Sequence, residues 1–107
     1  MKAKSFQEYL EKRLNKSEIV EIEKLAQLEM KYLQSLQKDI SKAVVRYMAA
    51  EQIGFNELVR RLNISPTQAS KIQSGSANLT LATIAHIFAL LKMRPHLVIK
   101  NKDMGQA

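Results

Sequence analysis

The scarcity of residues that interrupt helices is the strongest constraint on this fold. The 107 residues include three glycines and two prolines, and none of these lies between Ser17 and Glu51. Because Gly and Pro most often end regular elements, so few of them predict long helices and argue against a multi-stranded sheet. Residues 17–51 could form one helix or two, since Asp39 or Ser41 could cap a second one.

Apolar residues recur at helical spacing through the N-terminal third. Ser5 and Glu8 have the spacing of a capping box, which predicts a short first helix that ends near Asn15. A broad apolar stripe follows Ser17. Its members are Ile19, Ile22, Leu25, Ala26, Leu28, Tyr32, Leu33, Leu36 and Ile40.

Two short helices joined by a tight turn are predicted in the middle of the chain. Residues 55–62 form the first, with Leu58, Val59 and Leu62 inward, and Asn63 tolerates the left-handed conformation that a tight turn needs.

The second short helix has clear signals at both ends. Ser65 is its expected cap, Pro66 suits the first turn, and Gly75 ends it. Ala69 and Ile72 point inward, and the small Ala69 lets the two helices approach closely. This arrangement predicts a helix-turn-helix.

The sequence after the second short helix predicts one more helix and a strand. Residues 80–92 are strongly apolar, and Arg94 with Pro95 should end that helix. His86 on this helix is expected to pack inside or at the boundary of the core. Leu97, Val98 and Ile99 have strand character, and an isolated strand is best satisfied by pairing with its counterpart in a second subunit. The alternative is a disordered tail from His96 onward.

The spacing of apolar and small residues over positions 40–92 resembles the Cro/C1-type (XRE-like) repressors. The matching positions are Ile40, Val44, Tyr47, Ile53, Leu58, Val59, Leu62, Ile64, Ala69, Ser70, Ile72, Gly75, Leu81, Ile84 and Leu91. The resemblance implies an all-α protein with three parts. These are an N-terminal helical extension over 1–38, a five-helix DNA-binding domain over 39–93, and a C-terminal strand and flexible tail over 94–107.

In that family the second helix of the motif enters the major groove. By position, this implies that base edges are read by Pro66, Thr67, Gln68, Ser70 and Lys71. Amide, ammonium and methyl groups are suited to adenine, guanine and thymine edges respectively. Hydroxyl, amide and main-chain N–H groups can hold phosphates, and the candidates are Asn56, Ser65, Ser74, Asn78 and Thr80. Many family members have Gln where this chain has Phe55, so Asn56 is the candidate substitute.

The charge balance favours a polyanionic partner. Seventeen Lys and Arg against ten Asp and Glu give a net charge of +7. Residues 39–107 have nine basic and four acidic residues, or +5, but few of them lie on the reading helix. Tight binding then calls for a homodimer on a two-fold symmetric operator in double-stranded DNA. Arg60 and Arg61 are expected to serve solubility or steering.

The flanking segments resemble the HigA- and HipB-type antitoxins of type II toxin-antitoxin modules. Three segments carry this resemblance: the opening residues 6–14, the helical lead-in that follows them, and the strand-like residues 97–100 at the end. It implies that the protein binds a cognate toxin, a RelE/HigB-like ribonuclease or a HipA-like kinase, and represses its own operon. The alternatives are a stand-alone phage-type or metabolic repressor without a toxin partner, and a protein-binding helical adaptor. The apolar stripe could pack across the reading domain, build a dimer or dock the toxin.

Other classes of function find little support in the sequence. Cys is absent and only His86 and His96 are available as imidazole ligands, so no metal site is expected. No cofactor and no enzymatic activity are expected, because there is no glycine-rich phosphate loop and no nucleophile-base grouping. The chain also lacks a run of about 20 apolar residues and a signal-peptide pattern, which predicts a cytoplasmic protein without membrane contact.

Overall fold

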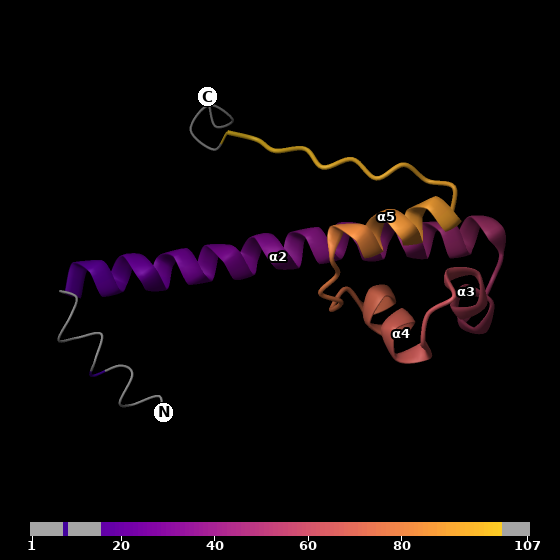
Figure 1. The fold of residues 1–107 in the computed structure, drawn as a ribbon, viewed down its shortest axis with the longest axis horizontal. Helices are drawn as coiled ribbons and strands as arrows, with labels where there is room; N and C mark the ends of the chain where they lie inside the picture. The colour runs from indigo at the N-terminus through magenta and orange to yellow at the C-terminus, as the bar shows by residue number, and fades with distance from the viewer. Residues whose placement is uncertain (1–7, 9–15, 102–107) are drawn as a thin grey trace.

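The computed structural model describes residue 8 and residues 16–101, and in this part of the chain all regular structure is helical (Figure 1). The elements are α2 (Lys16–Glu51), α3 (Phe55–Leu62), α4 (Pro66–Ser74) and α5 (Leu81–Leu90). The all-α prediction is confirmed. The helix predicted from Ser5 lies outside the described residues, apart from Glu8.

α2 is one uninterrupted helix of 36 residues, so Asp39 and Ser41 lie inside it and neither caps a second helix. Its sequence contains no Gly or Pro that would break the main-chain hydrogen bonds. The helix ends at Glu51, where Gln52 takes a positive φ of 55°. This decides between the two alternatives that the sequence left open.

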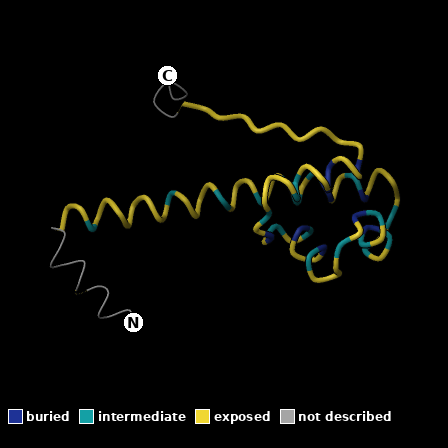
Figure 2. The backbone as a smooth tube through the Cα atoms, viewed as in Figure 1, coloured by how far each residue is buried: buried dark blue, intermediate teal, exposed yellow. Residues whose placement is uncertain are grey.

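The hydrophobic core lies entirely at the C-terminal end of α2 (Figure 2). α4 packs against α2 and α3, and α5 packs against α3. The buried core residues are Val44, Met48, Leu58, Leu62, Ile72, Ala77, Ile87, Phe88 and Leu91. Four short amphipathic segments therefore enclose one small core, and the first of them is the last third of a much longer helix.

The predicted turn and caps are present. Asn63 takes the left-handed conformation with φ 53°, and its N–H donates to the carbonyl of Val59. The Ser65 hydroxyl accepts a hydrogen bond from the N–H of Gln68 at 3.1 Å, and Pro66 occupies the first turn. Gly75 ends α4 at φ 78°. Asn63, Ser65 and Pro66 thus form the turn between α3 and α4, and Gly75 determines where α4 ends.

Two predictions about the fold are wrong. The expected five-helix domain has four helices in the described residues, because the chain offers only four apolar helical segments after residue 38. The C-terminal strand is also absent there: Leu97, Val98 and Ile99 are extended and exposed, Ile99 to 81%. A single chain gives this segment no neighbouring strand with which to form a ladder.

α5 buries a narrower face than its composition suggests. Ile87 and Phe88 are buried, whereas Leu81 is 77% exposed and His86 is exposed, against the expectation that His86 packs in or near the core. A helix of ten residues that contacts its neighbours along one side leaves the other side in solvent, whatever its residues are.

The apolar stripe of α2 from Ile19 to Leu36 does not pack across the core that follows it, whereas its last member, Ile40, does contact the core. The first part of the helix, residues 16–36, projects beyond the core (Figures 1 and 2), and Ile22, Leu25 and Tyr32 are about half exposed. We call residues 16–36 the free half of α2. Among the described helices, none combines the length and the mean hydropathy that crossing a membrane requires.

Candidate nucleic-acid interface

α4 presents a polar face to solvent, and this face contains most of the predicted base-reading residues. Pro66, Thr67, Ser70 and Lys71 are exposed, and Gln68 is half-buried. They share one side because residues three and four apart lie next to each other on a helix. Ser74 extends this side by one turn. We call these five exposed positions, with Gln68 at their edge, the α4 face.

The opposite side of α4 holds the helix rigidly on the core. Ala69 is fully buried and Ile72 is 1% exposed. The Ser41 hydroxyl of α2 donates a hydrogen bond to the carbonyl oxygen of Gln73 at 2.5 Å. The Gln37 amide donates to the carbonyl oxygen of Ala77 at 2.8 Å, which ties the following loop to α2 as well. The α4 face is thus placed by packing on one side and by two long-range hydrogen bonds at its C-terminal end.

The five predicted phosphate-binding residues are all exposed. Asn56 lies in the first turn of α3, and Ser65 and Thr80 are the N-caps of α4 and α5. Both cap hydroxyls accept main-chain hydrogen bonds at 3.1 Å, which leaves the Ser65 hydroxyl proton as a donor. The Thr80 hydroxyl also lies 2.9 Å from the Thr83 hydroxyl, and either of the two can donate to the other. Helix N-termini carry partial positive charge, so an anion is favoured at each of them.

The other two phosphate candidates follow the C-terminal end of α4. The Ser74 hydroxyl donates to the carbonyl of Lys71 at 3.2 Å and lies 2.9 Å from the Ser76 hydroxyl. Asn78 lies in the loop between α4 and α5. Predicted phosphate contacts therefore flank the α4 face at both ends.

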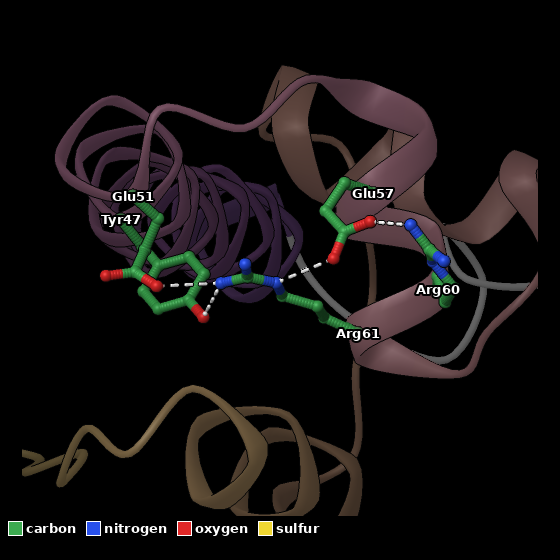
Figure 3. Close-up of polar contacts among 5 residues, drawn as sticks. All are labelled: Tyr47, Glu51, Glu57, Arg60 and Arg61. Atoms are coloured by element: carbon green, nitrogen blue, oxygen red, sulfur yellow. Dashed lines mark hydrogen bonds and ion pairs between the residues drawn. The ribbon is translucent and has the colours of Figure 1, made fainter.

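Arg61 has a structural role that the sequence interpretation missed (Figure 3). Its Nη1 donates to the Tyr47 hydroxyl and to Oε1 of Glu51, both at 2.8 Å, and its Nε donates to Oε2 of Glu57 at 3.1 Å. Arg60 pairs with the other oxygen of Glu57 and is itself exposed, which fits the expected solvent role. Arg61 links α3 to the end of α2.

These contacts shift two titrations in opposite directions. Hydrogen bonds from Arg61 and then Arg60 hold the pKa of the Glu57 carboxyl below its usual value. The hydrogen bond to Glu51, followed by those to Tyr47 and Glu57, raises the pKa of the Arg61 guanidinium. The Glu57–Arg61 spacing of four residues could have been recognised in the sequence. The Tyr47 and Glu51 contacts depend on how the helices pack, so no local spacing indicates them.

The described residues contain no group of three or more His, Cys, Asp or Glu side chains that could hold a metal ion. His86 and His96 are exposed and lie on or after α5, away from the α4 face in the sequence. No family model, curated protein or solved structure matches the chain.

Proposed function

We propose that this protein is a cytoplasmic, sequence-specific DNA-binding repressor, in which α4 enters the major groove of double-stranded DNA. The observation that carries this proposal is the α4 face. It is an exposed polar helix side with Thr67 and Lys71 open to solvent, set on buried Ala69 and Ile72. The width of the major groove admits one such helix, and the residue types on it suit base edges.

The modest charge of α4 supports binding as a homodimer to a two-fold symmetric operator. Lys71 is the one basic residue in this helix. Two copies would place two reading helices about 34 Å apart and roughly double the number of phosphate contacts. Leu97, Val98 and Ile99 are exposed apolar residues and are the proposed contact between the two subunits.

The free half of α2 supports the further proposal that the protein is an antitoxin. Its apolar side chains are exposed in the single chain, and a contiguous exposed apolar surface suits a protein partner. The proposed partner is the toxin, a RelE/HigB-like ribonuclease or a HipA-like kinase, which this surface would neutralise by direct binding. A stand-alone repressor would use the same surface for dimerisation instead.

DNA binding is tested with duplexes from upstream of the protein's own gene. We expect Lys71→Ala and Gln68→Ala each to weaken operator binding by about 1–3 kcal/mol, because each removes a base contact. Thermal unfolding should change little, since neither side chain belongs to the core. Lys100→Ala, in the coil after α5, is the matched control and should bind as the wild type does. Unchanged affinity in both α4 variants would refute the placement of the reading helix.

The antitoxin part is tested separately by co-expression with the neighbouring gene. A toxin should copurify with the wild type and not with Leu25→Asp/Tyr32→Asp, which places charges on the free half of α2. Failure of any neighbouring product to bind would remove the antitoxin proposal and leave the repressor proposal intact.

A further inference from the structure

A row of lysines follows the free half of α2 and continues into the domain. Lys24, Lys31 and Lys38 are spaced seven residues apart, and Lys42 follows four residues later. Seven residues are close to two full turns and four residues are close to one, so successive members are offset by only about 20° to 40° around the helix. The four lysines therefore form one side of α2, which we call the lysine row. All four are exposed, and Lys24 forms an exposed ion pair with Oε1 of Glu21 at 4.0 Å.

The lysine row borders an open hollow of about 670 Å³ between α2 and the end of α4. Its lining includes Lys31, Lys38 and Lys42, the hydroxyls of Ser35, Ser41 and Ser74, and Gln34 and Gly75. None of the described residues that line the hollow is acidic. Among ion pairs between described residues, none involves these three lysines. Three positive charges thus surround a concave surface lined mainly by polar residue types, where they raise the local potential for an anion.

The hollow is continuous with the α4 face. Ser74 belongs to both, and the hydrogen bond from Ser41 to the Gln73 carbonyl fixes α4 against α2 at this point. In Figure 1 the free half of α2 projects past the loop that joins α4 to α5, on the side where α4 ends. The lysine row therefore lies next to the C-terminal end of the α4 face.

We infer that the lysine row and the Ser74 hollow bind the phosphodiester backbone of duplex DNA next to the segment read by α4. The inference rests on the proposed DNA-binding function and adds a second contact region to it. Lys24 and Lys42 are 18 residues apart, or about 27 Å along the helix. At about 3.4 Å per base pair, this length matches about eight base pairs of flanking DNA. Lysine contacts to phosphate add affinity without sequence preference.

Salt-dependent binding to random-sequence duplexes tests the inference, because backbone contacts do not require the operator. Fluorescence anisotropy would compare the wild type, the triple variant Lys31→Gln/Lys38→Gln/Lys42→Gln and the control Lys92→Gln/Arg94→Gln/Lys100→Gln. Both variants lower the net charge from +7 to +4. Each lost phosphate contact should reduce the slope of log K against log salt by about 0.9, so the site variant should lose about 2 to 3 units. The control should lose less than about 1.

Two further experiments test the inference, one with duplexes of different length and one with free phosphate. A 10-base-pair duplex is too short to cover both regions, so the site variant should differ from the wild type much less on it than on a 24-base-pair duplex. Calorimetric titration with inorganic phosphate tests for a small-anion site. The assignment to DNA would be overturned if the wild type binds phosphate, the site variant does not, and the salt dependence of DNA binding is the same in both proteins. Circular dichroism and thermal unfolding would show that the variants remain folded.

The outcomes separate this inference from the proposed function. If the wild type binds duplexes and the site variant keeps its full salt slope, or loses no more than the control, the lysine row is a solvated surface and only this inference fails. If the wild type binds neither random nor upstream duplexes, the proposed function fails and the inference fails with it.

Discussion

Gly75 at the end of α4 and Gly54 before α3 place different demands on the backbone. Gly75 ends α4 at φ 78°, and a Cβ built there would meet the Ser41 Cβ at 3.6 Å, an ordinary contact. Gly54 precedes α3 at φ −97°, and a Cβ added there would have no other atom within 4 Å. The difference between the two sites is therefore conformational and not steric.

We expect Gly75→Ala to lower the free energy of unfolding by about 1–2 kcal/mol, because an L-residue is strained in the left-handed region. Gly54→Ala is the matched control. The backbone of Gly54 is in a conformation that any residue can adopt. Alanine is a poorer N-cap than glycine, which lowers the free energy of unfolding, but it also makes the unfolded chain less flexible, which raises it. The net change in the free energy of unfolding should therefore stay within about 0.5 kcal/mol. Urea denaturation measures both. Equal losses in the two variants would contradict the assignment of strain to Gly75.

Glu57 makes a pH-dependent contribution to stability. Its folded-state pKa lies below the usual glutamate value because Arg61 and Arg60 hydrogen-bond to the carboxylate. The pairing therefore stabilises the fold above the unfolded-state pKa, and this contribution is lost as the pH falls through the folded-state pKa. Glu57→Gln should melt at a lower temperature than the wild type at about pH 6, and the difference should shrink towards about pH 3.

Glu29→Gln on the exposed side of α2 is the control for that measurement, since no ion pair between described residues involves Glu29. A Glu57→Gln difference that stays constant with pH would mean that the carboxylate charge is not what stabilises the α3 to α2 junction.

At the scale of the element, α4 depends on a small residue at its closest approach to the neighbouring helices. Ala69 is fully buried, while the next residue, Ser70, is exposed. We expect Ala69→Leu to cost about 1–3 kcal/mol of unfolding free energy, because a larger side chain overpacks the site. Ser70→Leu adds the same side chain one position away, on the solvent side, and should leave stability nearly unchanged. Chemical denaturation of both variants distinguishes tight packing from a general intolerance of leucine in α4.

The elements that the sequence predicted well are those with local signals. The turn at Asn63, the Ser65 cap, Pro66 and Gly75 act within a few residues, and each lies in the structure where its chemistry requires. The misjudged features depend on distant parts of the chain. Whether His86 is buried is decided by what packs against α5, and a strand at Leu97 needs a neighbouring strand that apolar periodicity does not indicate.

In the candidate site, too, the features with local sequence signals could be predicted and the long-range contacts could not. The exposed positions of α4 could be read from helix spacing, because Ala69 and Ile72 fix which side faces inward. The contacts of Arg61 with Tyr47 and Glu51, and the hollow beside Ser74, could not, since each joins α2 to residues at least ten positions further along the chain. The hollow further depends on α2 continuing as one helix from Lys31 to Lys42.

At the scale of the whole molecule, the chain combines a compact core with a helix that extends away from it. The Cα radius of gyration is 19.0 Å, against about 13 Å for a compact chain of this length. The described residues before Ile40 contribute no side chain to the hydrophobic core. A helix without tertiary packing is marginally stable in water, so the free half of α2 should be the least stable helical part of an isolated subunit.

Native-state hydrogen exchange tests this in the purified protein. Amides of the free half of α2 should exchange by local fraying, whereas those around Val44 and Met48 should exchange only with global unfolding, because their side chains are buried. Adding a bound toxin should protect the free half and leave the core amides unchanged. Equal protection of both regions in the purified protein would instead mean that a second copy already covers the apolar side of the free half. In that case Leu25→Asp/Tyr32→Asp should lower the molecular mass measured by sedimentation to that of one chain.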